Sequence, residues 1–252
     1  MCRVSAIESL RIANVRPETL DAVLFANSNA GWSASDEIAI LSAFREMGVP
    51  QTKIIGLQFQ NCSGFGCALD IATNLLRYDE PSRVLIVLCG NAKKELSRFD
   101  PHTRTVFGDG AASCIVSNDA VGFEILSTMT LIDPSLATSD HTPSLARLRF
   151  KNLRKTIEDA YLRAGIGPKD ITTVLGTNGN ILYFELMGEA AGVPSEKVYR
   201  GDLDTLGHIY SCDNIIALRN HSLTTAVNAG NYFLVIGWSP YAVSATILRA
   251  MS

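Results

Sequence analysis

Two distant stretches of this chain read so much alike that they indicate an internal duplication. Residues 9–29, SLRIANVRPETLDAVLFANSN, align without a gap with residues 160–180, AYLRAGIGPKDITTVLGTNGN. The aligned identities include Pro17 with Pro168, Val23–Leu24 with Val174–Leu175, Asn27 with Asn178, and Asn29 with Asn180. Each stretch predicts a helix end, a turn containing proline, and a buried strand that runs into a polar loop.

The likeness continues beyond these stretches. GVPQTKIIGL at residues 48–57 echoes GVPSEKVYRG at 192–201, and a helical pattern precedes each. In both halves a short polar segment, a further helix and two apolar strands follow. The repeated unit is therefore helix-strand-helix-strand-helix-strand-strand. Short apolar runs of this kind suit sheets that are covered on both faces. The sequence therefore predicts an α/β protein with an N-terminal half (1–120), a connecting strand and loop (121–144) and a C-terminal half (145–252).

The duplication sets Cys62 opposite His208. Cys62 heads the predicted helix of the first half, and Gly207–His208 heads the corresponding helix of the second. If the halves pack about a pseudo-two-fold axis, the two helix starts face each other. A helix N-terminus favours a thiolate, and a nearby histidine can take its proton. The pattern thus predicts a cysteine nucleophile with a histidine base, against the simpler interpretation of Cys62 as a small buried hydrophobic residue.

Asp213 follows His208 by five positions and has two interpretations. Its carboxylate could orient the imidazole, or it could simply occupy the first turns of a helix, where acidic residues are favoured. The sequence alone leaves both open.

Charge and composition argue against several classes of function. A net charge of -3 gives no basic face for nucleic acid. The apolar runs are far shorter than the ~20 residues of a membrane span, and the first residues lack the apolar stretch of a signal peptide. The six cysteines form no CxxC pair, which argues against a zinc site and favours free thiols in the cytoplasm.

NCSGFGCALDIA at residues 61–72, FGDGAAS at residues 107–113 and the repeated halves together resemble the thiolase superfamily. The nearest branch is the 3-oxoacyl-[acyl-carrier-protein] synthase III-like enzymes. The resemblance implies a duplicated five-layer αβαβα fold, usually dimeric, and acyl thioesters of coenzyme A or acyl carrier protein as substrates, with no other cofactor and no metal. It also implies opening strands ahead of residue 1, so the fold is expected to be N-terminally shortened. The sheet edge and apolar surface exposed in this way predict aggregation or tight dimerisation. The expected assembly is a homodimer, or a heterodimer with another thiolase-fold chain.

The chain departs from this family at two catalytic positions. Where the family has a histidine in a PHQAN-like stretch, this sequence reads GTNGN, with Thr177 at the histidine position and Asn180 retained. Where the family has a catalytic asparagine, this sequence has His208. Decarboxylative condensation uses both family groups, and each donor is worth about 10²–10³ in rate. Acyl transfer needs only the acyl-cysteine and one base.

Two supporting features are expected from the resemblance. The oxyanion hole would combine the Cys62 backbone N–H with one from the GWSPY loop at residues 237–241, contributed by Trp238 or Ser239. A bulky Trp238 could instead narrow the acyl pocket. Thr177 and Asn180 are either polar groups of the pocket or residues that cap the loop.

The sequence therefore predicts an acyltransferase that carries its acyl group on Cys62, with His208 as base and Asp213 and Asn180 in support. Fatty-acid-like or polyketide-type secondary metabolism is the expected setting. Decarboxylative condensation to a 3-oxoacyl product is the alternative among enzymes. A degenerate, non-catalytic subunit of a thiolase-fold heterodimer is the alternative from another class.

Overall fold

The computed structural model describes residues 1–28, 33–77, 80, 82–91, 97–119, 122–201 and 203–251. The expected boundary at residues 120–121 and Asn29 of the repeat lie outside the described residues. Within the described part of the chain, no helix is both long enough and apolar enough to cross a membrane.

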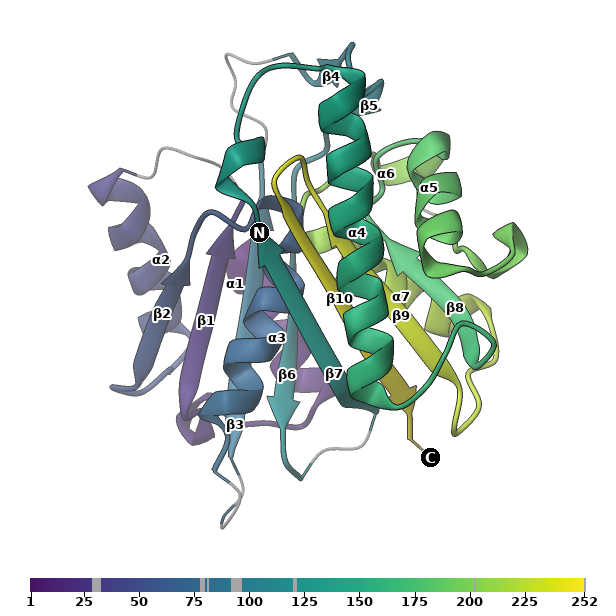
Figure 1. Ribbon diagram of the computed structural model, residues 1–252. Coiled ribbons are helices and arrows are strands. Elements are labelled where there is room, and N and C mark those ends of the chain that lie inside the picture. The colour runs from purple at the N-terminus through teal and green to yellow at the C-terminus, as the bar shows by residue number, and fades with distance from the viewer. Residues whose placement is uncertain are drawn as a thin grey trace.

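Two four-stranded sheets repeat the same core arrangement (Figure 1). The first has the order β2 (Lys53–Leu57), β1 (Ala22–Asn27), β3 (Arg83–Gly90), β6 (Gly110–Ser117). The second has the order β7 (Phe123–Ile132), β10 (Ala242–Ala250), β9 (Tyr232–Trp238), β8 (Ile171–Gly176). The pairs β1–β3 and β8–β9 are parallel, and the pairs β3–β6 and β9–β10 are antiparallel. The order and directions of β1, β3 and β6 therefore recur in β8, β9 and β10, as the repeat predicts.

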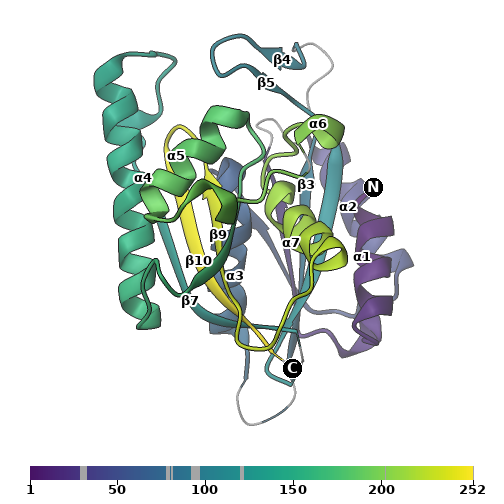
Figure 2. The same ribbon diagram turned by 90° about the vertical axis from the view of Figure 1, so that its right-hand side faces the viewer.

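Helices separate and cover the two sheets, giving five layers (Figure 2). The outer face of the first sheet carries α1 (Cys2–Ile12) and α2 (Ala34–Glu46). Between the sheets lie α3 (Gly64–Leu75) and α7 (Cys212–Thr224), and the outer face of the second sheet carries α4 (Pro143–Ala164) and α5 (Ile181–Ala191). A hairpin of β4 (Phe99–Asp100) and β5 (Thr105–Val106) stands at one end, near the short α6 (Leu203–Leu206). The thiolase-like αβαβα architecture follows from these layers.

Small residues let α3 fit between the sheets. Gly64, Gly66, Ala68 and Ala72 are all buried on this helix. A Cβ added at Gly66 would lie 2.4 Å from the Cβ of Ser244 on β10, so the helix touches the second sheet at backbone distance. Because a close-packed interior has no spare volume, this contact fixes where the start of α3 stands relative to β9 and β10.

The repeat predicts a strand within residues 192–201, and this prediction is wrong. The counterpart of β2 is reduced to one bridge between Val174 and Val198. Pro194 starts a 3-10 turn over Ser195–Lys197, and the N–H groups of Lys197 and Val198 bond within that turn. Because these two N–H groups already have partners within the turn, they cannot form strand hydrogen bonds with β8.

Candidate active site

Cys62 lies in a 3-10 turn, Asn61–Ser63, that leads directly into α3. Its side chain is buried. Asn61 adopts a left-handed backbone conformation with φ of 43°, which asparagine tolerates better than most residues. The Asn61 side chain donates to the Tyr241 hydroxyl over 2.7 Å and so ties this turn to the β9–β10 turn. The first N–H groups of a helix have no partner within it, so the thiol stands where a negative charge is stabilised.

Three buried side chains form a continuous hydrogen-bonded chain across the two halves. The Cys62 Sγ lies 3.0 Å from His208 Nε2, although 146 positions separate them in the sequence. The His208 Nδ1 lies 2.5 Å from Asp213 Oδ2. The repeat predicts the meeting of Cys62 and His208. Asp213 lies in the first turn of α7 and also contacts the imidazole, so the features behind both interpretations of this residue are present.

His208 does not head a helix, contrary to the prediction from the repeat. Helix α7 begins at Cys212, and His208 lies in an extended segment that forms a bridge with Phe107. Its N–H donates to Val106 O over 2.8 Å, and Gly108 N–H donates to His208 O over 2.9 Å. These two bonds hold the backbone extended, so the FGDGA segment serves to position the histidine.

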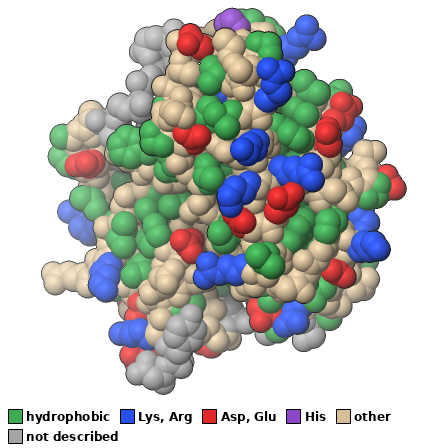
Figure 3. Space-filling model, viewed as in Figure 1, with side chains coloured by type: hydrophobic (Ala, Val, Ile, Leu, Met, Phe, Trp, Pro, Cys, Tyr) green, Lys and Arg blue, Asp and Glu red, His purple; other side chains and the backbone are tan. Residues whose placement is uncertain are grey.

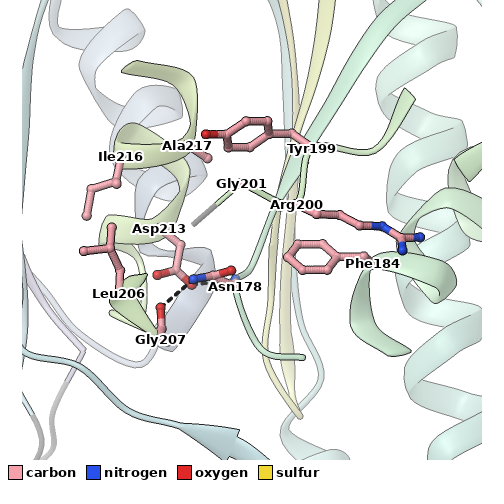
Figure 4. A pocket seen from close by; sticks show the side chains of 11 residues that line it. Asn178, Phe184, Tyr199, Arg200, Gly201, Leu206, Gly207, Asp213, Ile216 and Ala217 are labelled. Atoms are coloured by element: carbon pink, nitrogen blue, oxygen red, sulfur yellow. Dashed lines mark hydrogen bonds between the residues drawn. The ribbon is translucent and has the colours of Figure 1, made fainter. Parts of the chain in front are cut away.

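Asp213 is itself held by backbone donors. The Ile209 N–H donates to Oδ1 and the Asn178 N–H to Oδ2, each over 2.7 Å. Figure 4 shows Asn178 beside Asp213 and Gly207, and all three residues line a cavity of about 10 Å³. The Asn178 side chain donates to Gly207 O over 2.6 Å. Asn178 therefore ties the end of β8 to the histidine loop.

Neighbouring charges favour the protonated form of His208. Burial works against the charged imidazolium, but the negative charges of Cys62 and Asp213 and the hydrogen bonds to both outweigh it, so the pKa of His208 is raised well above its usual value. The pKa of His208 therefore depends on the charge of both neighbouring groups.

A cavity of about 160 Å³ opens onto the thiol and the imidazole. Polar side chains of the β4–β5 hairpin form part of its wall, with Asp100 and Thr103 among them. Aromatic side chains form another part of the wall, namely Phe107, Tyr183, Tyr210 and Trp238. Among the described residues, no group of three histidine, cysteine or acidic side chains is arranged to hold a metal ion.

Asn180 and Thr177 have different surroundings. The Asn180 side chain caps α5 by accepting from the Tyr183 N–H over 3.1 Å, and it also donates to Thr103 O. It therefore joins α5 to the β4–β5 hairpin as a loop-capping residue. Thr177 lines the cavity.

The N–H groups of Trp238 and Ser239, which the sequence predicts as oxyanion donors, are bonded within the protein. The Trp238 N–H donates to Thr177 Oγ1 over 2.9 Å, and the Ser239 N–H donates to Ala242 O over 2.9 Å. Thr177 stands where the family's histidine is expected, and its short hydroxyl reaches the Trp238 backbone. The side chain of Trp238 lines the cavity, in line with the alternative that it narrows the pocket.

Replacing Gly237 by alanine is expected to lower the free energy of unfolding by about 1–3 kcal/mol, because the added methyl overpacks the Cys62 turn. Its Cβ would lie 2.4 Å from Cys62 O and 2.7 Å from the Cα of Ser63. The matched control is Gly56→Ala in β2, where a Cβ meets nothing within 4 Å and the change should stay below about 1 kcal/mol. Urea unfolding measures both variants. Equal midpoints for Gly237→Ala and the unaltered protein would contradict this close approach.

Comparisons with known proteins agree with this architecture. The family model described as 3-oxoacyl-[acyl-carrier-protein (ACP)] synthase III matches residues 59–134, which include Cys62 and the FGDGA segment. A curated relative, beta-ketoacyl-[acyl-carrier-protein] synthase III of Aquifex aeolicus, is 24% identical over 246 residues, covering 93% of this chain and 78% of the relative.

Two solved structures share the fold over the whole chain. One is named "ChlB3 [Aceyltransferase]", with a TM-score of 0.84, 22% identity, and coverage of 100% of this chain and 83% of that one. The other is the priming beta-ketosynthase from the R1128 polyketide biosynthetic pathway, with a TM-score of 0.77, 20% identity, and coverage of 100% and 81%. The resemblance to 3-oxoacyl-[acyl-carrier-protein] synthase III and the thiolase-like fold are thereby confirmed.

Proposed function

We propose that this protein is an acyltransferase that takes an acyl group from a thioester onto Cys62 and passes it to a nucleophilic acceptor. The observation that carries the proposal is the buried chain of Cys62, His208 and Asp213, with contacts of 3.0 Å and 2.5 Å. A thiol, an imidazole and a carboxylate in this order form the arrangement that activates a nucleophile and then a second substrate.

The first half-reaction loads the acyl group. The Cys62 thiolate attacks the carbonyl carbon of the thioester, a new carbon–sulfur bond forms, and the carbonyl electron pair moves onto oxygen. When the intermediate collapses, the bond to the donor thiol breaks, and the departing thiolate takes the proton held by His208. His208 is left neutral beside an acylated cysteine.

The second half-reaction transfers the acyl group. Neutral His208 accepts the proton of an alcohol, amine or thiol as that group attacks the acyl carbon. Asp213 holds Nδ1 and stabilises the imidazolium that forms, while Asn178 and Ile209 hold the carboxylate in place. Collapse of this intermediate returns the thiolate of Cys62 and the proton on His208.

The surroundings of Thr177 favour transfer over decarboxylative condensation. Condensation in the resembling family uses a histidine and an asparagine together, and here Thr177 stands at the first position and His208 at the second. The Thr177 hydroxyl is bonded to the Trp238 backbone. The polyketide ketosynthase among the similar structures keeps condensation as the second candidate.

Coenzyme A or an acyl carrier protein is the proposed acyl donor, in fatty-acid-like or polyketide-type metabolism. The cavity of about 160 Å³ suits a short acyl group, since pockets for drug-sized ligands are roughly 300–1,000 Å³. Figure 3 shows Lys and Arg side chains over α4, with acidic side chains among them. Arg154 and Lys155 pair with Glu158 and Asp159, and Arg147, Arg149 and Lys151 lie closer to the start of the helix. The Arg149 Nε donates to Pro240 O over 3.0 Å, and Pro240 lines the cavity, so this basic surface adjoins the site and suits an anionic donor.

A dimer in the cytoplasm is part of the same proposal. The β2 strand forms an edge of the first sheet and is largely exposed, with Ile54 at 39%, and Phe59 just beyond it is 77% exposed. Pairing with a second copy or a related chain would cover this edge. The buried Cys62–His208 pair speaks against a degenerate subunit, which has no use for a nucleophile and base. The native mass of the acyl-loaded protein tests this assembly: a dimer is expected, and a monomer would contradict it.

The decisive experiment separates transfer from condensation. The acyl-loaded protein is offered a malonyl thioester in one arm and a panel of alcohols, amines and carrier thiols in the other. Transfer predicts acyl products in the second arm and no carbon dioxide in the first. Release of carbon dioxide with a 3-oxoacyl product would replace this proposal by condensation.

A further inference from the structure

Acylation and transfer through Cys62 each create a negative oxygen on the former carbonyl, and this oxygen needs two donors. The Cys62 N–H stands at the start of a helix and suits the first role. The N–H groups of Trp238 and Ser239 are already bonded to Thr177 Oγ1 and Ala242 O. A second donor must therefore come from another group on the cavity wall.

Tyr183 is held at the cavity wall beside Trp238. It lies in the first turn of α5, and its N–H donates to the capping Asn180 side chain over 3.1 Å. Its ring centroid lies 5.0 Å from that of Trp238 at an interplanar angle of 50°. A Cβ at Gly179 would lie 3.0 Å from the tyrosine ring, so the glycine allows this packing. Tyr183 therefore lines the cavity next to Trp238, the residue whose loop N–H was expected to donate.

The hydroxyl of Tyr183 is available as a donor. Within the part of the chain that the structure describes, no hydrogen bond engages it, whereas the ring lines the same cavity as Cys62 and His208. Burial, together with the negative charges of Cys62 and Asp100, raises the pKa of Tyr183 to about 12, and Arg149 opposes them. The phenol thus keeps its proton at neutral pH.

Tyr210 also lines the cavity but suits the role less well. Its ring packs 5.2 Å from Phe107 and 5.2 Å from His208. Burial raises the pKa of Tyr210 to about 12, and the charges acting on it include Asp109 and Arg98 besides Cys62. The Tyr210 ring thus packs against the base itself, whereas the Tyr183 ring packs against Trp238.

The geometry points to Tyr183 as a catalytic residue that donates its phenolic hydrogen to the oxyanion. This inference rests on the proposed acyl transfer and deepens it. As Cys62 Sγ bonds to the acyl carbon, the carbonyl electron pair moves onto oxygen, which accepts hydrogen bonds from the Tyr183 hydroxyl and the Cys62 N–H. The electron pair returns when the bond to the leaving thiol breaks, and Tyr183 keeps its proton throughout. Thr177 and Tyr183 then act together. The Thr177 hydroxyl accepts the hydrogen bond of the Trp238 N–H, and the Tyr183 hydroxyl takes the place of that N–H as oxyanion donor.

The test compares Tyr183→Phe with Tyr232→Phe. Both substitutions remove one phenolic oxygen, but Tyr232 lies at the far end of β9 from Trp238. Two single-turnover rates are measured on each protein. One is acylation of Cys62 by an acyl-CoA, followed by rapid quenching and intact mass. The other is alkylation of Cys62 by iodoacetamide, which forms no oxyanion. Tyr183→Phe is expected to slow acylation by about 10²-fold or more and to leave alkylation within about twofold.

Several results would overturn the assignment. Acylation of Tyr183→Phe within about threefold of the unaltered protein would remove Tyr183 from the oxyanion site. Equal losses of acylation and alkylation would show that the substitution disturbs the thiol and the imidazole instead. If the unaltered protein alkylates at Cys62 but accepts no acyl group from any donor, the proposed function fails and the Tyr183 role fails with it.

Discussion

Replacing Cys62 by alanine is expected to lower thioester consumption by about 10⁴-fold or more, to the background rate, because the substitution removes the group that forms the acyl-enzyme. The measurement is the release of free donor thiol from an acyl-CoA at saturating concentration. Three other cysteines of the chain are poor nucleophiles. Burial raises the pKa of Cys67 and of Cys212, and it raises that of Cys114 to about 12, so these side chains stay protonated and unreactive.

Cys2 provides the matched control. A hydrogen bond with Cys89 lowers the pKa of Cys2 to about 7, which gives it the reactivity of an activated thiol. It lies on α1, on the outer face of the first sheet and outside the cavity lining. Cys2→Ala should therefore retain full activity. Activity that survives Cys62→Ala and disappears in Cys2→Ala would identify Cys2 as the nucleophile and contradict this account.

Replacing His208 by alanine is expected to slow acyl transfer by about 10²- to 10⁴-fold, because the acceptor loses its base. The rate is measured as loss of the acyl mass from preloaded protein after acceptor is added. Thermal unfolding of the same sample shows whether the fold is retained. A transfer rate within about threefold of the unaltered protein would exclude His208 as the base.

Asp213→Asn tests the same base through its pH dependence. The Asp213 charge contributes to the raised pKa of His208, so its removal lowers that pKa. Neutral imidazole then persists to lower pH, and the acid limb of the transfer rate should shift to lower pH. The plateau rate should fall as well, since Nδ1 loses its orienting carboxylate. An acid limb that stays in place would contradict the contact between Asp213 and the base.

The repeat made much of the fold predictable. The alignment of residues 9–29 with 160–180 correctly predicts that β1 and β8 follow a proline turn, because buried strands leave a strong apolar pattern. It also predicts that Cys62 meets His208, since equivalent positions in packed halves face each other. The failure over residues 192–201 has a local cause, namely Pro194 and the turn that it starts.

The finer geometry of the site depends on contacts that periodicity does not encode. His208 is extended because residues 106–108 bond its backbone, a pairing between segments far apart in the sequence. Asn178 had a signal in the aligned pair Asn27 and Asn178, but its hydrogen bonds to Asp213 and Gly207 become visible only in three dimensions. The hydrogen bond from the Trp238 N–H to Thr177 likewise depends on how the segment after β8 lies against the end of β9.

The most direct test of a covalent acyl-cysteine is intact-protein mass spectrometry with a panel of acyl-CoA donors, followed by peptide mapping and an acceptor chase. The account predicts a gain of one acyl mass on the peptide that contains Cys62, absent from Cys62→Ala and lost when the acceptor is added. A gain that persists in Cys62→Ala, or no gain with any donor, would contradict it.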